Sequence, residues 1–209
     1  DSGTQVKSIC ADYFMEAPLH STNPETVEKS KSILDKLLKN AASIGVTDVV
    51  IPCVDQASLK NDVDKERFIK NILPSARKAE KLGMHLALET DLAPKSFMEL
   101  LNTLDCRSVT VNYDTGNSAS LGYNPEEEFE MYGNRISDIH IKDRILGGGP
   151  VPLGQGNTDF KRIMELIVAS NFHGPLILQT YRDNEGKAIF RAQLDWFKNI
   201  SGLQSIGST

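Results

Sequence analysis

The stretch SDIHIKDRILGGGPVPLGQGNTDF, from Ser137 to Phe160, contains a predicted strand, the loop that follows it and the start of a helix. It starts as an apolar strand, runs into the charged cluster His-Ile-Lys-Asp-Arg, passes through five glycines and ends where a helix begins. Runs that are apolar at nearly every position are typical of strands buried on both faces, as in parallel sheets. The stretch therefore predicts a strand whose carboxyl end carries polar side chains, followed by a glycine-rich loop and a helix.

The same succession of strand and helix occurs six times along the chain. The predicted strands are Val6–Asp12, Asp48–Val54, His85–Thr90, Ser108–Asp114, Ile136–Asp143 and Pro175–Thr180. The predicted helices are Thr22–Ile44, Lys65–Leu82, Pro94–Leu104, Pro125–Tyr132, Asp159–Ser170 and Gly186–Ile200. Strict alternation predicts an α/β fold with a parallel sheet, either a (β/α) barrel or a doubly wound sheet. Because no change of composition marks a linker, we expect one domain over residues 1–209.

Composition narrows the class of protein. The 209 residues are 40% hydrophobic and 24% charged, with a net charge of -5, and this acidic balance argues against a nucleic-acid partner. No apolar run approaches the roughly 20 residues that a membrane span needs, so no membrane partner is expected. The three cysteines form no CxxC pair, which predicts a reduced, cytoplasmic protein with buried thiols.

Polar side chains end four successive predicted strands. Glu89 and Asp114 end the third and fourth, His140 lies near the end of the fifth, and Gln179 lies near the end of the sixth. Each has an ordinary explanation on its own, because a strand-end carboxylate often caps a turn and a lone histidine often belongs to the core. Ligands of parallel α/β sheets bind at this edge, so their joint occurrence favours a site. Carboxylate, imidazole and amide groups together suit a divalent metal ion.

At these residues the chain resembles a known family, the xylose isomerase-like (β/α) barrels, and in particular their sugar and sugar-phosphate isomerases and epimerases. The motifs that carry the resemblance are ICADYFMEAPL near the start, ALET at Ala87–Thr90, NYDTGN at Asn112–Asn117, HIKD at His140–Asp143 and PLGQGNTDF at Pro152–Phe160. The resemblance implies a TIM barrel and proton transfer on a small sugar or sugar phosphate through an enediolate. It also implies a divalent metal, with Mn²⁺ or Mg²⁺ favoured over Zn²⁺ or Co²⁺.

The family barrel has eight βα units, and the motifs of this chain match units three to eight. We therefore expect the first two units to be absent. An open barrel of six units would leave unpaired strand edges, so we expect either a homo-oligomer or a fragment of a longer protein. A doubly wound sheet stays the alternative fold at this point.

The resemblance also implies roles for single residues. Glu89, Asp114 and His140 correspond to metal ligands, and Gln179 stands where the family ordinarily has a fourth, glutamate ligand. Glu89 would also be the proton-transfer base. The residues expected to contact substrate are Glu16, His20, Asn117, Arg144 and Arg182.

Glu89, Asp114, His140 and Gln179 form what we call the strand-end cluster, and the roles of the residues beside it stay open. Lys142 points to the same face as His140, so we expect it to act as an acid or to steady an anionic oxygen, unless it forms a surface ion pair with Asp143. Asp143 is expected to hold His140 or Lys142 in place. The five glycines either bring backbone N–H groups to a phosphate or form a mobile flap.

Gln179 leaves the reaction itself open. A glutamine is neutral and cannot act as a base, which argues against a two-base mechanism. The alternatives to an epimerase are a polyol dehydratase of the same fold and a non-catalytic sugar-binding barrel. The endonuclease branch of the superfamily would need more histidines than the four present and a basic groove.

Overall fold

The computed structural model describes residues 3–182, 184 and 186–202, which form two compact units. The first unit contains the described residues up to Asn112 together with Arg135–Asp138. The second contains Tyr113–Asn134 and the described residues from Ile139 onward. The boundary passes through two strands, each of which begins in the first unit and ends in the second. Each unit is described by itself below.

Six strands of the described chain form the main sheet: β1 (Ser8–Cys10), β2 (Asp48–Cys53), β3 (His85–Thr90), β4 (Val109–Asp114), β5 (Ile136–Ile141) and β8 (Leu176–Leu178). Their order in the sheet is the same as their order along the chain. The pairs β1–β2, β2–β3, β3–β4 and β5–β8 are parallel. A doubly wound sheet reverses its strand order at a switch point, so the unreversed order favours the barrel.

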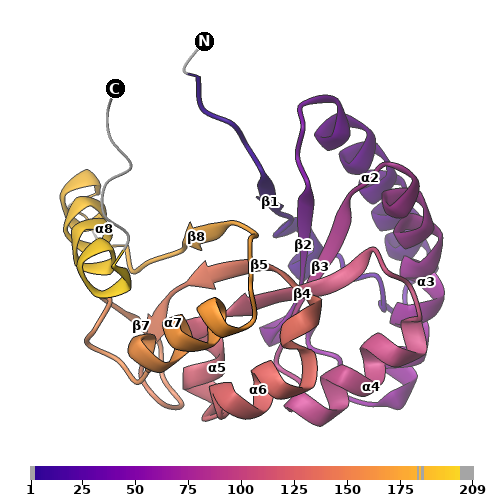
Figure 1. Cartoon of the computed structure of the whole chain (residues 1–209). Helices are drawn as coiled ribbons and strands as arrows, with labels where there is room; N and C mark the ends of the chain where they lie inside the picture. The colour runs from indigo at the N-terminus through magenta and orange to yellow at the C-terminus, as the bar shows by residue number, and fades with distance from the viewer. Residues whose placement is uncertain (1–2, 183, 185, 203–209) are drawn as a thin grey trace. The chain divides into compact units, whose positions relative to one another are not determined.

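The first unit carries its long helices next to its strands (Figure 1). These helices are α2 (Pro24–Ser43), α3 (Asp62–Lys81) and α4 (Pro94–Leu104), with the short α1 (Tyr13–Glu16) and a 3₁₀ turn, η1 (Asp55–Ala57), before them or between them. Helix α3 contacts α2, α4 and β3. Asparagine side chains cap two of these helices, since Asn23 accepts from the Glu25 N–H and Asn61 from the Asp64 N–H, both at 2.9 Å.

The second unit contains α5 (Thr115–Leu121), α6 (Pro125–Tyr132), α7 (Phe160–Ala169) and α8 (Lys187–Ser201). A 3₁₀ turn, η2 (Gly133–Arg135), follows α6 and crosses the unit boundary. Helix α7 contacts both α6 and α8. Two short strands, β6 (Asp143–Arg144) and β7 (Pro150–Val151), pair antiparallel as a hairpin beyond the end of β5 (Figure 1).

The strand and helix predictions are confirmed for all six βα repeats, with shifts of a few residues at some ends. The sequence reasoning missed α1, α5 and the β6–β7 hairpin, which lies inside the predicted loop. No helix in the described part of the chain is both long and apolar enough to span a membrane. The single barrel domain over 1–209 stays a prediction, and the ends of that range lie outside the described residues.

The cysteines match the expectation of buried, unreacted thiols. All three are free, Cys53 and Cys106 are buried, and Cys10 is half-buried. Burial raises the pKa of the Cys10 and Cys53 thiols far above the ordinary value. Because the thiolate is the reactive form, the raised pKa of these two thiols argues against a nucleophilic role.

Candidate active site at the strand ends

Asp114, the last residue of β4, uses its two carboxylate oxygens differently. Oδ1 accepts the backbone N–H of Asn117 at 2.8 Å and so caps helix α5. Oδ2 lies 3.4 Å from Lys142 Nζ and 3.9 Å from His140 Nδ1. The capping role and the cluster role predicted for this residue are therefore compatible, because each takes one oxygen. Asp114 and His140 are both buried.

Lys142 lies between the ends of two strands. Its Nζ contacts Asp114 Oδ2 and donates to Gln179 Oε1 at 3.1 Å. The register explains this contact, because β5 pairs with β8 at Ile141↔Leu178 and the next residue on each chain is Lys142 and Gln179. The alternative of a surface ion pair with Asp143 is wrong, since the Lys142 ammonium points to Asp114 and Gln179.

The start of helix α5 is bound to the backbone of Lys142. Thr115 Oγ1 donates to the Lys142 carbonyl at 2.7 Å and accepts the Lys142 N–H at 3.0 Å. A Cβ at Gly116 would lie 2.8 Å from Lys142 Cγ, so only glycine allows this approach. The pair Thr115-Gly116 therefore places the first turn of α5 directly against the residue that carries the ammonium group.

Asp143 holds the glycine-rich loop. Its Oδ2 accepts the N–H groups of Gly154 and Gly156, each at 2.9 Å, and its Oδ1 accepts the Thr158 N–H at 3.1 Å. The carboxylate is buried, and a Cβ at Gly156 would lie 2.2 Å from Asp143 Oδ1. These bonds show that Asp143 anchors the loop, and its expected role in orienting His140 or Lys142 stays a prediction.

Arg144 and Asn117, two of the predicted substrate contacts, bond to each other. Arg144 Nη1 donates to Asn117 Oδ1 at 2.8 Å, and Arg144 Nε donates to the Gly148 carbonyl at 3.0 Å. Asn117 is buried and Arg144 half-buried. Arg182 follows β8 and is exposed. These three residues lie in the same unit as Asp114 and His140.

The first unit contains the other predicted site residues. Glu89 is buried near the end of β3, where its Oε2 accepts from Asn112 Nδ2 at 2.9 Å. His20 is buried against the ring of Phe68, and burial lowers its pKa. Glu16, in α1, is exposed.

Asn112 is a site residue that the sequence reasoning did not single out. It stands two positions before Asp114 on β4, and side chains two apart on a strand point to the same face. It is buried, and it orients the carboxylate of Glu89. The signal was present in the motif NYDTGN, where the polar Asn112 and Asp114 alternate with Tyr113.

A buried carboxylate supports β4 from the other face. Glu128, on α6, accepts hydroxyl hydrogens from Tyr113 at 3.0 Å, from Tyr132 at 2.8 Å and from Ser118. Burial raises the pKa of Glu128, and the three donors oppose that effect. Since Tyr113 directly precedes Asp114 and Ser118 lies in α5, this network fixes the end of β4 to two helices.

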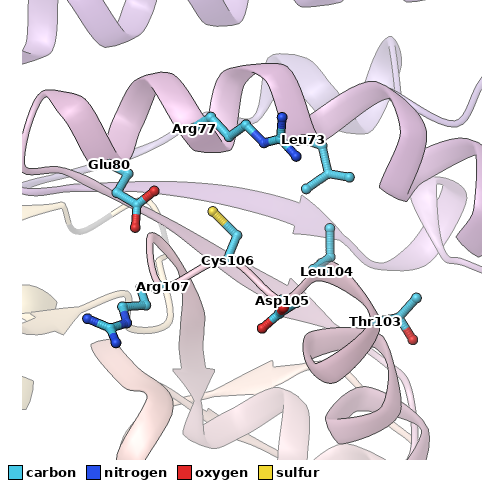
Figure 2. A pocket seen from close by; sticks show the side chains of 8 residues that line it. All are labelled: Leu73, Arg77, Glu80, Thr103, Leu104, Asp105, Cys106 and Arg107. Atoms are coloured by element: carbon cyan, nitrogen blue, oxygen red, sulfur yellow. The ribbon is translucent and has the colours of Figure 1, made fainter.

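A pocket of about 510 Å³ lies elsewhere, between α3 and the segment that follows α4 (Figure 2). Its charged lining residues are Arg77, Glu80, Asp105 and Arg107, all exposed. Arg107 lies two residues before β4, so the pocket is at the amino end of this strand. None of the predicted site residues lines this pocket, so it is separate from the strand-end cluster.

Comparisons with known proteins agree with this arrangement. The family described as xylose isomerase-like TIM barrel matches residues 1–200. The L-ribulose-5-phosphate 3-epimerase UlaE of Salmonella paratyphi A is 24% identical over 213 residues, covering 95% of this chain and 73% of the relative. The apo 3-keto-D-glucoside 4-epimerase YcjR of E. coli has a TM-score of 0.79 at 16% identity, over 95% and 80% of the two chains. The IOLI protein, crystallised with a zinc atom, has a TM-score of 0.77 at 16% identity, over 96% and 77%. This chain belongs to the xylose isomerase-like TIM barrel family.

Proposed function

We propose that this protein is a divalent-metal-dependent isomerase or epimerase of a small sugar or sugar phosphate, which moves a proton between neighbouring carbons through an enediolate. The observation that carries the proposal is the group of Asp114, His140, Lys142 and Gln179 at the strand ends of a chain of this family. The UlaE relative, an epimerase of a ketopentose phosphate, supports the reaction class. We further propose that the protein acts as a homo-oligomer in the cytoplasm.

The donor set suits a hard divalent ion. Glu89, Asp114 and His140 supply two carboxylates and one imidazole, all buried, and each offers one ligand atom. Asn112 supports the assignment, because it binds Glu89 and shares a strand face with Asp114. Gln179 would be the fourth ligand through its amide oxygen. Oxygen-rich sets of this kind favour Mn²⁺ or Mg²⁺ over softer ions.

The bound ion would act as a Lewis acid that polarises the substrate carbonyl. Glu89 would take the proton from the neighbouring carbon, with its carboxylate held in orientation by Asn112. Lys142, held by Asp114 and Gln179, would donate a proton to the oxygen of the substrate or steady its negative charge. Because Gln179 cannot act as a base, the return of the proton falls to Glu89 or to Lys142.

We propose that the remaining predicted contacts bind the outer parts of such a substrate. Asn117 and Arg144 belong to the same unit as Lys142, and Arg182 is exposed beyond β8. We propose that Glu16 and His20 reach substrate hydroxyls from the first unit. A non-catalytic sugar-binding barrel is the second candidate function, because Gln179 offers its amide oxygen to Lys142 and brings no charge.

The test is exchange of a substrate C–H hydrogen with solvent deuterium. Purified protein is loaded with Mn²⁺ and incubated in heavy water with L-ribulose 5-phosphate and a panel of ketoses, and exchange is followed by NMR. We expect exchange in the wild type and at least a 1000-fold loss, as a rough estimate, in Glu89→Gln, because the base is removed. Glu99→Gln, an exposed residue of α4, is the matched control and should leave exchange unchanged.

Metal content separates the two candidate functions. Bound Mn²⁺ is measured in the wild type and in Asp114→Asn after desalting. Stoichiometric metal without exchange of any substrate would support the sugar-binding barrel and refute the enzyme. Equal metal content in the wild type and Asp114→Asn would contradict the assigned ligands.

A further inference from the structure

Arg144 carries an uncompensated positive charge. Its guanidinium donates only to neutral acceptors, the Asn117 amide oxygen and the Gly148 carbonyl, and no carboxylate of the described residues forms an ion pair with it. Arg67 and Arg162 differ, since they pair with Asp64 and Glu126, whereas Arg135 also donates only to backbone carbonyls, those of Cys106 and Val109. The two bonds use Nε and one hydrogen of Nη1. Nη2 and the second Nη1 hydrogen keep the end of the fork available for an oxyanion.

The position of Arg144 relates it to the candidate site. His140, Lys142 and Arg144 alternate along the chain, so their side chains point to the same face. Lys142 contacts Asp114 and Gln179, and Arg144 lies two residues further, about 6.6 Å along an extended backbone. The backbone of Arg144 is fixed by its pairing with Pro150 in the β6–β7 hairpin. The hairpin therefore fixes the backbone from which the guanidinium extends.

Between Gly154 and Thr158 every N–H group of the glycine-rich loop is already bound within the protein. The N–H groups of Gly154, Gly156 and Thr158 all bind the carboxylate of Asp143. The Asn157 N–H binds the Arg144 carbonyl at 2.9 Å, and the Gln155 N–H binds the Pro152 carbonyl at 3.0 Å. Asp143 thus takes the place that a phosphate would fill in an anion-binding nest.

We propose that Arg144 recognises the anionic group of the substrate, a phosphate ester or a carboxylate, and that the glycine-rich loop does not. This inference rests on the proposed function and adds that the substrate carries an oxyanion a few bonds from the reacting carbons. An oxyanion bound end-on by Nη1 and Nη2 would meet a fork already oriented by Asn117 and Gly148. Pre-orientation lowers the entropy cost of a bidentate contact, and a charged bidentate contact is among the stronger hydrogen-bonded interactions.

The experiment compares charged and neutral substrates in Arg144→Gln. Values of kcat/KM are measured for L-ribulose 5-phosphate, for a ketose that carries a carboxylate and for neutral L-ribulose. We expect a loss of about 100-fold for the substrate whose anion Arg144 binds, and less than about 3-fold for L-ribulose. Loss with the phosphate alone identifies a phosphate ester, and loss with the carboxylate alone identifies a sugar acid. Arg191→Gln, an exposed residue of α8, removes the same charge as a control.

A binding measurement keeps the inference testable if the enzyme proposal fails. Inorganic phosphate is titrated calorimetrically into the wild type, Arg144→Gln, Arg144→Lys and Asp143→Asn. We expect phosphate binding to be lost in Arg144→Gln and weakened in Arg144→Lys, which keeps the charge but not the fork. Unchanged phosphate binding and equal kinetics for charged and neutral substrates in Arg144→Gln would overturn the assignment. Absence of exchange in the wild type, with Arg144-dependent phosphate binding, would refute only the enzyme proposal.

Discussion

Replacing Asp143 with alanine should destabilise the protein by about 4 kcal/mol, because three backbone donors lose a buried anion at once. The bonds to Gly154, Gly156 and Thr158 are 2.9, 2.9 and 3.1 Å long. Removing a charged acceptor from a buried donor costs about 1.5–3 kcal/mol for each bond. The simple sum is an upper limit, because water enters the space and rebinds part of the N–H groups.

The assay is thermal unfolding, followed by circular dichroism. A chain of this length loses about 2–4 °C in Tm for each kcal/mol, so Asp143→Ala should unfold about 8–16 °C earlier than the wild type. Formate should recover part of the loss, since its carboxylate fits the three donors, whereas chloride at equal ionic strength should recover less. Amide hydrogen exchange at Gly156 and Thr158 should accelerate in the variant and slow again in formate.

Asp159→Ala provides the control for this reasoning. Asp159 accepts one N–H, from Arg162 at 3.0 Å, as the exposed N-cap of α7. Its loss should cost about 1 kcal/mol, with no recovery in formate. If Asp143→Ala is no less stable than Asp159→Ala, the three bonds from the loop to Asp143 do not contribute as argued. That result would refute the interpretation of Asp143 as the anion that the loop N–H groups bind.

Three further predictions concern other buried contacts. A hydrogen bond to Asp48 raises the pKa of His85 above 6.5. The pair therefore stabilises the fold fully below pH 6.5, and this stabilisation is lost as the pH rises through the pKa of folded-state His85. In urea unfolding at several pH values, His85→Gln should lack this loss of stability. Burial raises the pKa of Glu128 above 4.5. The free energy of unfolding of the wild type should therefore fall as the pH rises from 4.5 through the pKa of folded-state Glu128, and Glu128→Gln should not show this decrease. Gly154→Ala should cost about 2 kcal/mol, because its φ is +84° and the new Cβ would lie 2.4 Å from Trp196 Cζ2. Trp196→Leu in the Gly154→Ala background should recover part of that loss in the same unfolding assay, and a further loss would contradict the clash.

Local signals in the sequence determine most of the fold. Helices α4 and α6 were predicted to the residue, because each starts with a proline at its first position, and Asn124 caps α6. Helix α5 was missed because its sequence, TGNSASL, is rich in residues with poor helix propensity. It forms through tertiary contacts instead, namely the cap by Asp114 and the bonds between Thr115 and the Lys142 backbone. No local pattern contains that information.

Part of the candidate site was also predictable from local signals, and part depends on tertiary contacts. The strand ends were predictable, because apolar runs followed by polar residues identify one edge of a parallel sheet, and the structure places Asp114, His140 and Gln179 there. The partner of Asp143 was not predictable, because its loop contacts lie 11 to 15 residues downstream. The catalytic and ligand roles of Glu89 and its partners stay predictions until exchange and metal content are measured.

The cluster His-Ile-Lys-Asp-Arg is best understood through the alternation of side chains along an extended backbone. His140, Lys142 and Arg144 point to one face, and Ile141 and Asp143 to the other, where both are buried. The first face presents an imidazole and two cations, and the second supplies a core residue and an anion for the loop. Gly156 follows from that anion, because the approach of the loop to Asp143 leaves no room for a Cβ at this position. The strand end thus holds its own loop through Asp143, which leaves Arg144 as the group that we propose binds the substrate anion.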